Sequence, residues 1–229
     1  MPQAPRRLWL ASRLAALASL ALSTACAHPV VAPPEPDLAG YYDGSRFEMF
    51  AGLRLSKDHT FEFALSVGAL DLRSSGTWQS QGNSVLFTTS PEPVPPMFEL
   101  AGPSAESDAP LVTVTWPNGE PIQNIRVDLV CADGSIVTGF TSPEGWSPAE
   151  SECDSPKSLK LHEEIYDIAS RAFALKPDAG ASTPRLHFIL QPNDLGVLDL
   201  TDARGAVIDG RLELETSKGR LEFRKVPAN

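Results

Sequence analysis

Residues 53–87 decide the fold and read LRLSKDHTFEFALSVGALDLRSSGTWQSQGNSVLF. Apolar residues recur at every second position in four short pieces: Leu53-Arg-Leu55, Phe61-Glu-Phe63-Ala-Leu65, Gly76-Thr-Trp78 and Val85-Leu-Phe87. Turn-forming residues such as Gln81-Gly82-Asn83 separate these pieces. Because successive side chains of a strand point to opposite faces, this spacing predicts a meander of short antiparallel strands in a β-sandwich or barrel.

The end of the chain repeats this pattern. Alternating segments such as Leu186-His-Phe188-Ile-Leu190, Leu212-Glu-Leu214 and Leu221-Glu-Phe223 are joined by turn residues. We therefore expect a mainly β protein, in which residues 38–100 and 184–226 form one antiparallel barrel-like sheet and residues 108–178 form an inserted β-sandwich. The alternative is two consecutive β domains divided near Pro103.

The first of these segments is similar to the small lipocalin-like barrels of bacterial lipoproteins. The similarity is a strand pattern, G-x-Y, L-x-L, F-x-F, G-x-W and L-x-F, and it covers Gly40 to Tyr42, Leu53, Leu55, Phe61, Phe63, Gly76, Trp78, Leu86 and Phe87. The resemblance implies a barrel that binds a small apolar ligand in its interior.

The middle segment has a different pattern. Its order G-x-P-I, V-x-L, D-G, T-x-x-G-W resembles transthyretin-like and carboxypeptidase-regulatory-like sandwich modules, at Gly119, Pro121, Ile122, Val127, Leu129, Asp133, Gly134, Thr141, Gly145 and Trp146. Such modules are accessory or binding domains. The stretch before it, from Pro91 to Pro110, is rich in Pro, Gly, Ser and Ala, which predicts a linker or long loop.

One short helix is expected in the middle segment. Ile165, Ile168, Ala169, Ala172 and Phe173 fall at helical spacing, which favours an amphipathic helix from about Glu163 to Phe173. For so short a segment, a strand-loop-strand conformation stays open.

The first 25 residues are typical of an export signal. Three Arg residues precede an uncharged Leu/Ala-rich run from Leu14 to Leu22, and no acidic residue occurs before Glu35. This apolar run is shorter than the roughly 20 residues that a membrane-spanning helix needs. We therefore expect residues 1–25 to be a signal peptide.

Leu22-Ser23-Thr24-Ala25-Cys26 resembles the lipobox of bacterial lipoproteins. The resemblance implies that Cys26 is lipidated, and that Ala27 directs the protein to the outer membrane, where it would face the periplasm. Residues 26–37 would then be a Pro-rich tether in extended polyproline II. The alternative is cleavage at Ala25-Cys26-Ala27, which would give a soluble periplasmic or secreted protein.

Cys131 and Cys153 remain as a pair when Cys26 is lipidated. An exported domain meets an oxidising environment, in which such a pair is expected to form a disulfide. Two separate thiols are the alternative.

The charge restricts the partners. The chain of 229 residues carries a formal net charge of −10; residues 1–25 hold three Arg and no acid, so the exported part carries −13. Nucleic-acid binding needs a concentrated basic face, so nucleic acid is not expected as a partner. The charge also argues against electrostatic attachment to an anionic membrane surface.

Motifs for catalysis or metal binding are weak. The chain has no G-x-S-x-G, Walker or G-x-G-x-x-G motif. His162-Glu163-Glu164-Ile165-Tyr166 has Tyr where a metalloprotease helix needs its second His. The other possible groups are carboxylates of Glu163 and Asp167 on one helical face, calcium-like oxygen sets at Asn193-Asp194 and Asp199 to Asp202, and an aromatic cleft of Trp78, Trp116 and Trp146. Each of these is expected to be structural.

These observations favour a non-catalytic, membrane-anchored envelope lipoprotein that acts as a binding or structural module. It would require no cofactor or metal, and its partners would be the membrane, through the lipid, and another envelope protein or a small apolar ligand. Two alternatives stay open: a lipocalin-like carrier or sensor, and a periplasmic hydrolase with an acidic site assembled by the fold. No ligand-binding residue is assigned.

Overall fold

The computed structural model describes residues 37–103, 109–175 and 184–227, and within these ranges the protein consists of strands without a helix. The predicted signal peptide, Cys26 and nearly all of the predicted tether lie outside the described residues. The strands are β1 (Gly40–Asp43), β2 (Met49–Leu55), β3 (Thr60–Val67), β4 (Leu70–Gln81), β5 (Ser84–Thr89), β6 (Met97–Pro103), β7 (Val112–Thr115), β8 (Arg126–Cys131), β9 (Ile136–Phe140), β10 (Pro156–Glu163), β11 (Ile168–Ala169), β12 (Phe173–Ala174), β13 (Leu186–Gln191), β14 (Arg204–Ile208), β15 (Arg211–Thr216) and β16 (Gly219–Lys225).

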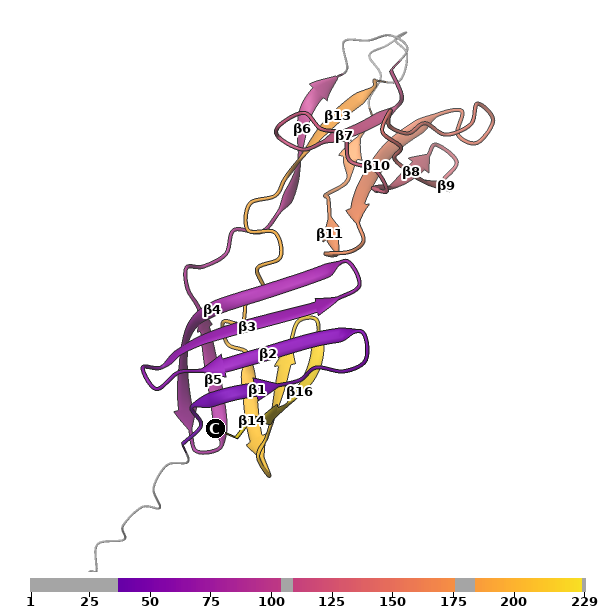
Figure 1. Ribbon diagram of the computed structural model, residues 1–229. Coiled ribbons are helices and arrows are strands. Elements are labelled where there is room, and N and C mark those ends of the chain that lie inside the picture. The colour runs from indigo at the N-terminus through magenta and orange to yellow at the C-terminus, as the bar shows by residue number, and fades with distance from the viewer. Residues whose placement is uncertain (1–36, 104–108, 176–183, 228–229) are drawn as a thin grey trace, which may run out of the picture. The chain divides into compact units, whose positions relative to one another are not determined.

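Eight strands form a closed antiparallel barrel in the order β1-β16-β15-β14-β5-β4-β3-β2. The early strands, indigo to purple in Figure 1, lie beside the late strands, which are yellow. Two strand pairs join the early strands of the barrel to the late ones: β5 pairs with β14, and β1 pairs with β16. The expected mainly β fold, with a barrel built from both halves of the chain around an inserted segment, is therefore confirmed.

The interior of the barrel is filled by its own side chains. Apolar residues at alternate positions point inward, and Leu53, Phe61, Phe87, Leu212 and Phe223 are each at most 1% exposed. Phe61 meets Phe87 edge to face, with ring centroids 5.1 Å apart. An accessible lumen would leave exposed surface on these side chains, so the barrel has a packed core instead of the hollow interior of a carrier.

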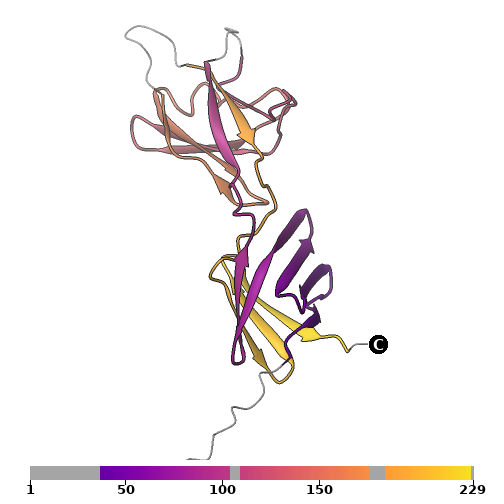
Figure 2. The same ribbon diagram turned by 90° about the vertical axis from the view of Figure 1, so that its left-hand side faces the viewer.

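Two further sheets enclose a second core. The larger has the order β11-β10-β8-β9, with β12 also paired to β10, and the smaller has the order β6-β13-β7. Val127, Leu129, Leu159 and Leu161 of the larger sheet pack with Phe188 of the smaller one, and all five are fully buried. Figure 2 shows this pair of sheets as a sandwich.

Two strands of the smaller sheet differ from the expected arrangement. β13, which has the alternating pattern assigned to the barrel, pairs with β6 and runs parallel to β7. β6 lies in the stretch expected to be a linker, and within β6 only Phe98 is well buried. Alternation predicts that a segment is a strand, but it does not identify the neighbouring strand. The exact domain boundaries therefore stay a prediction.

The helix expected from Glu163 to Phe173 is wrong. The segment forms β11 and β12, with a turn over residues 164–167. The Glu163 carboxylate accepts hydrogen bonds from the backbone N–H groups of Ile165 and Tyr166, and Asp167 has φ of 60°. A left-handed residue ends a helix, so the alternative strand-loop-strand conformation is the one adopted.

The expected disulfide between Cys131 and Cys153 is present. Cys131 ends β8, and Cys153 precedes β10, the strand that pairs with β8. No helix that could cross a bilayer occurs in the described ranges.

Candidate binding cavity

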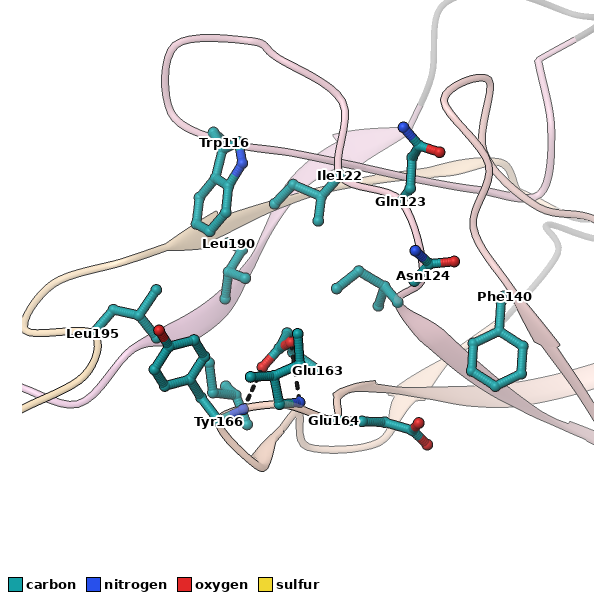
Figure 3. Close-up of a pocket in the computed structure, with 13 residues that line it drawn as sticks. Trp116, Ile122, Gln123, Asn124, Phe140, Glu163, Glu164, Tyr166, Leu190 and Leu195 are labelled. Carbon is teal, nitrogen blue, oxygen red and sulfur yellow. Dashed lines mark hydrogen bonds between the residues drawn. The ribbon is translucent and has the colours of Figure 1, made fainter. Parts of the chain in front are cut away.

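The sandwich contains an apolar cavity of about 550 Å³ at one end of its two sheets. Figure 3 shows side chains from several segments turned toward this space. They come from the end of β7 and the loop after it, the end of β9, the turn between β10 and β11, β13 and the loop that follows β13. The lining residues are Trp116, Ile122, Gln123, Asn124, Ile125, Phe140, Glu163, Glu164, Ile165, Tyr166, Ile168, Leu190 and Leu195.

The base of the cavity belongs to the sandwich core, and its rim is accessible. Ile125 and Leu190 are 1% exposed, so they form a fixed apolar base. At the rim, Phe140 is 50% exposed and Ile165 is 48% exposed. Half-exposed apolar side chains beside a buried base would lose contact with water when an apolar ligand enters, which favours binding.

A buried hydroxyl group holds one wall in place. Thr141 is 3% exposed; its Oγ1 donates to the Ile122 carbonyl at 2.8 Å and accepts from the Ile125 N–H at 3.1 Å. Asn124, with φ of 62°, donates its backbone N–H to the Thr141 carbonyl at 2.8 Å. Together with the bond from the Ile122 N–H to the Val114 carbonyl of β7, these bonds satisfy the backbone of a wall that lies outside the named strands, so the wall is preformed.

The opposite wall is the turn that replaces the expected helix. The Glu163 carboxylate accepts the N–H of Tyr166 at 2.8 Å, and Glu164 accepts from Arg126 Nη1 at 2.7 Å. Figure 3 shows the two bonds of Glu163 to the turn as dashed lines. Both carboxylates therefore already have partners, and neither is a free acid or base directed at the cavity.

The three Trp residues considered for an aromatic cleft lie in three different places and do not form one cleft. Trp78 is buried in the barrel, where its Nε1 donates to the Ser56 carbonyl at 3.0 Å. Trp146 packs closely over Gly139 of β9, where an added Cβ atom would overlap the indole ring. Trp116 alone lines the cavity.

The His residues take structural positions. His59 packs against Trp78 with ring centroids 5.1 Å apart, and His187 Nε2 lies 3.0 Å from Thr115 Oγ1. His162 Nε2 is 3.0 Å from Asp167 Oδ1, and this hydrogen bond lowers the pKa of Asp167. His28 lies outside the described residues. In the ranges that the structure describes, no three His, Cys, Asp or Glu side chains form a group that could hold a metal ion.

The acidic residues considered as possible cation ligands have other hydrogen-bond partners. Glu163 and Asp167 would share a helical face, but in the turn each has its own partner. Asp194 accepts the Val94 N–H, and Asp199 accepts the Thr201 N–H, so both act within loops as expected. Hydrogen bonds from Thr201 lower the pKa of Asp199 below its ordinary value of 3.8.

Sequence patterns give little information about this cavity. Its lining extends from Trp116 to Leu195 and comes from loops and strand ends, where alternation stops. Thr141, which holds one wall, occurs in the sequence only as part of the transthyretin-like pattern. The half-exposed Phe140 and Ile165 are apolar residues next to turns, and this is the one signal that could have found the rim.

Together, the fold and the cavity define an all-β protein with a filled eight-stranded barrel and a disulfide-bonded sandwich that carries an apolar cavity. Comparison of the chain with family models, with curated proteins and with solved structures found no significant match.

Proposed function

We propose that this chain is an exported, lipid-anchored and non-catalytic binding protein of the bacterial envelope, whose ligand site is the sandwich cavity. The observation that carries the proposal is the preformed apolar space of about 550 Å³ with half-exposed Phe140 and Ile165 at its rim. This volume falls in the range of small-molecule sites, roughly 300–1,000 Å³. The lipobox-like sequence at Cys26 and the disulfide support the compartment.

The ligand expected here is a small, uncharged and mainly apolar molecule. Ile125 and Leu190 give the cavity an aliphatic base. The polar groups of the lining are the amides of Gln123 and Asn124, the Tyr166 hydroxyl, the Trp116 indole N–H and two carboxylates that already have partners. The barrel interior is filled, so the sandwich takes the role that the lipocalin-like resemblance gave to the barrel. Isolation of the native protein from membranes, followed by mass spectrometry of the lipids and proteins that co-purify with it, would identify the natural ligand or partner.

Ile165→Asp is expected to weaken binding of a neutral apolar probe, N-phenyl-1-naphthylamine, by at least about tenfold. A bound probe would cover the exposed half of Ile165, and losing that contact while desolvating a carboxylate costs roughly 1.4 kcal/mol or more. Fluorescence titration measures the dissociation constant.

Ile136→Asp is the matched control, since Ile136 is 63% exposed on β9 and does not line the cavity. Equal affinities for the two variants, with the probe bound, would place the probe elsewhere and contradict the proposed site.

Cys26→Ala is expected to abolish incorporation of a labelled fatty acid in growing bacteria and to release the protein from the membrane fraction. The thiol of Cys26 is the acceptor in the lipobox-like sequence, and acyl chains contribute about 0.8 kcal/mol of membrane binding per buried methylene. Gel fluorography and fractionation measure both effects. Label that persists in Cys26→Ala refutes the anchor, and Cys131→Ala with Cys153→Ala serves as the control that keeps it.

A further inference from the structure

The barrel carries a second, polar cleft of about 650 Å³ on its outer surface, between the β1–β2 turn and strands β15 and β16. We call it the arginine cleft. Its lining residues include four cationic ones, Arg46, Arg211, Arg224 and Lys225, and two acidic ones, Asp43 and Glu222. This excess of positive charge is unusual in a chain whose formal net charge is −10.

The side chains of two of the four cationic residues form no ion pair or hydrogen bond with the described part of the chain. Arg211 of β15 and Arg224 of β16 are direct cross-strand partners. Like charges at directly opposed positions repel, unless an anion lies between them. Within residues 37–103, 109–175 and 184–227, neither guanidinium forms a hydrogen bond or an ion pair.

The neighbouring acids form no ion pair with Arg211 or Arg224 among the described residues. Asp43 is the cross-strand partner of Arg224 on the other side, but its carboxylate accepts the Ser45 N–H at 3.0 Å. Glu222 lies 3.8 Å from Arg46. The two unpaired guanidinium groups are therefore free to bind one oxyanion, for which a pair of planar forks is well suited.

The cleft lies where the chain comes from the predicted anchor. Lys225 follows Arg224 on β16, but its Nζ lies on the opposite face, over the Tyr42 ring, and donates to the Asp37 carbonyl at 2.7 Å. Asp37, the first residue that the structure describes, therefore lies at the same end of β16 as the cleft. Cys26 precedes Asp37 by 11 residues. A chain of that length reaches about 40 Å at most, at roughly 3.6 Å per residue. A lipid on Cys26 would thus keep the cleft within that distance of the headgroups.

We propose that the arginine cleft binds the phosphate group of an anionic phospholipid in the membrane that holds the anchor, with Arg211 and Arg224 as the ligands of the phosphate. The proposal rests on the lipid anchor proposed above. The anchor supplies the proximity that a net negative chain cannot gain by long-range attraction, and within a Debye length of about 8 Å the local cations decide the interaction. The bound protein would then hold one end of its barrel on the membrane surface.

Arginine modification tests the proposal on the lipidated protein in vesicles. Phenylglyoxal labelling, read residue by residue by mass spectrometry, is compared in phosphatidylcholine vesicles and in vesicles that also contain phosphatidylglycerol. Arg211 and Arg224 are expected to react at least about fivefold more slowly in the second, as a bound site would. Arg54 and Arg220, which are each paired with an acid at the surface, are the internal controls and should keep their rates.

A third arm adds millimolar inorganic phosphate to the phosphatidylcholine vesicles. Protection by free phosphate but not by phosphatidylglycerol would overturn the membrane source, and no protection in either arm would overturn the site. Equal slowing of all four Arg residues would also overturn it, because it reports a general surface effect. If Cys26 carries no lipid, fatty-acid labelling fails, but inorganic phosphate still protects Arg211 and Arg224 when the cleft binds phosphate. Failure of the lipid anchor and failure of the phosphate site are therefore distinguishable.

A pair of double variants completes the test. R211Q/R224Q is expected to lose the rise in melting temperature that inorganic phosphate gives the full chain, and R54Q/R220Q is expected to keep it. Both remove two exposed guanidinium groups from the barrel, so a loss shared by the two variants would contradict a specific site.

Discussion

Phe61→Ala is expected to lower the free energy of unfolding by about 3–5 kcal/mol, the usual cost of removing a buried aromatic side chain. Phe61, the second residue of β3, is 1% exposed, and its ring meets Phe87 edge to face with the ring centroids 5.1 Å apart. The cavity left behind would remove contacts from both sides of the closed barrel. Since small domains are stable by about 5–15 kcal/mol, this loss is a large part of the total.

Urea titration followed by far-UV circular dichroism measures the change. Phe47→Ala is the matched control, because Phe47 is 91% exposed and its removal should change the free energy by no more than about 0.5 kcal/mol. Similar losses for the two variants would show that the barrel interior is not the packed core described above.

The contact between Phe61 and Phe87 also restricts where a ligand can bind. A barrel that depends on Phe61 and Phe87 in contact has no room for a ligand unless this contact opens. Under the two proposals made above, the filled barrel serves as a scaffold, and ligands bind at the sandwich cavity and at the arginine cleft. Binding functions then depend on the loops and strand ends that the scaffold leaves exposed.

Period-two alternation predicted most strands because in this protein one face of each strand is buried and the other is solvated. Phe61, Phe63 and Leu65 all point into the barrel, as their spacing requires. The same rule could not place β13, whose burial pattern alternates as well but whose neighbours are β6 and β7. Strand pairing is a long-range property that a local pattern does not contain.

The helix expected from Glu163 to Phe173 does not form, because local hydrogen bonds and a left-handed residue favour a turn. Ile168 and Phe173 are both buried, which satisfies the helical spacing equally well when two short strands flank a turn. The Glu163 carboxylate and the left-handed Asp167 then decide between the two conformations. The same turn forms one wall of the cavity. A sequence pattern that predicts a helix at this segment therefore cannot predict the cavity.

The disulfide is expected to contribute stability without shaping the cavity. Replacing Cys131 and Cys153 together with Ala should lower the free energy of unfolding by about 3 kcal/mol, because the bond closes a chain segment with a sequence separation of 22. Dithiothreitol should lower the stability of the unmodified protein by a similar amount, and Cys26→Ala should leave it unchanged.

The affinity of the double variant for the neutral probe should stay nearly unchanged, although its free energy of unfolding falls. In the pairing of β8 with β10, Cys131 lies opposite Pro156 at one end, while Arg126 lies opposite His162 at the other, next to the cavity. The disulfide acts mainly on the unfolded chain, so at a temperature where the double variant is folded its dissociation constant should stay within about threefold of the original. A tenfold weaker constant in the folded variant would show that the bond also holds the cavity wall, which its position at the far end of the two strands argues against.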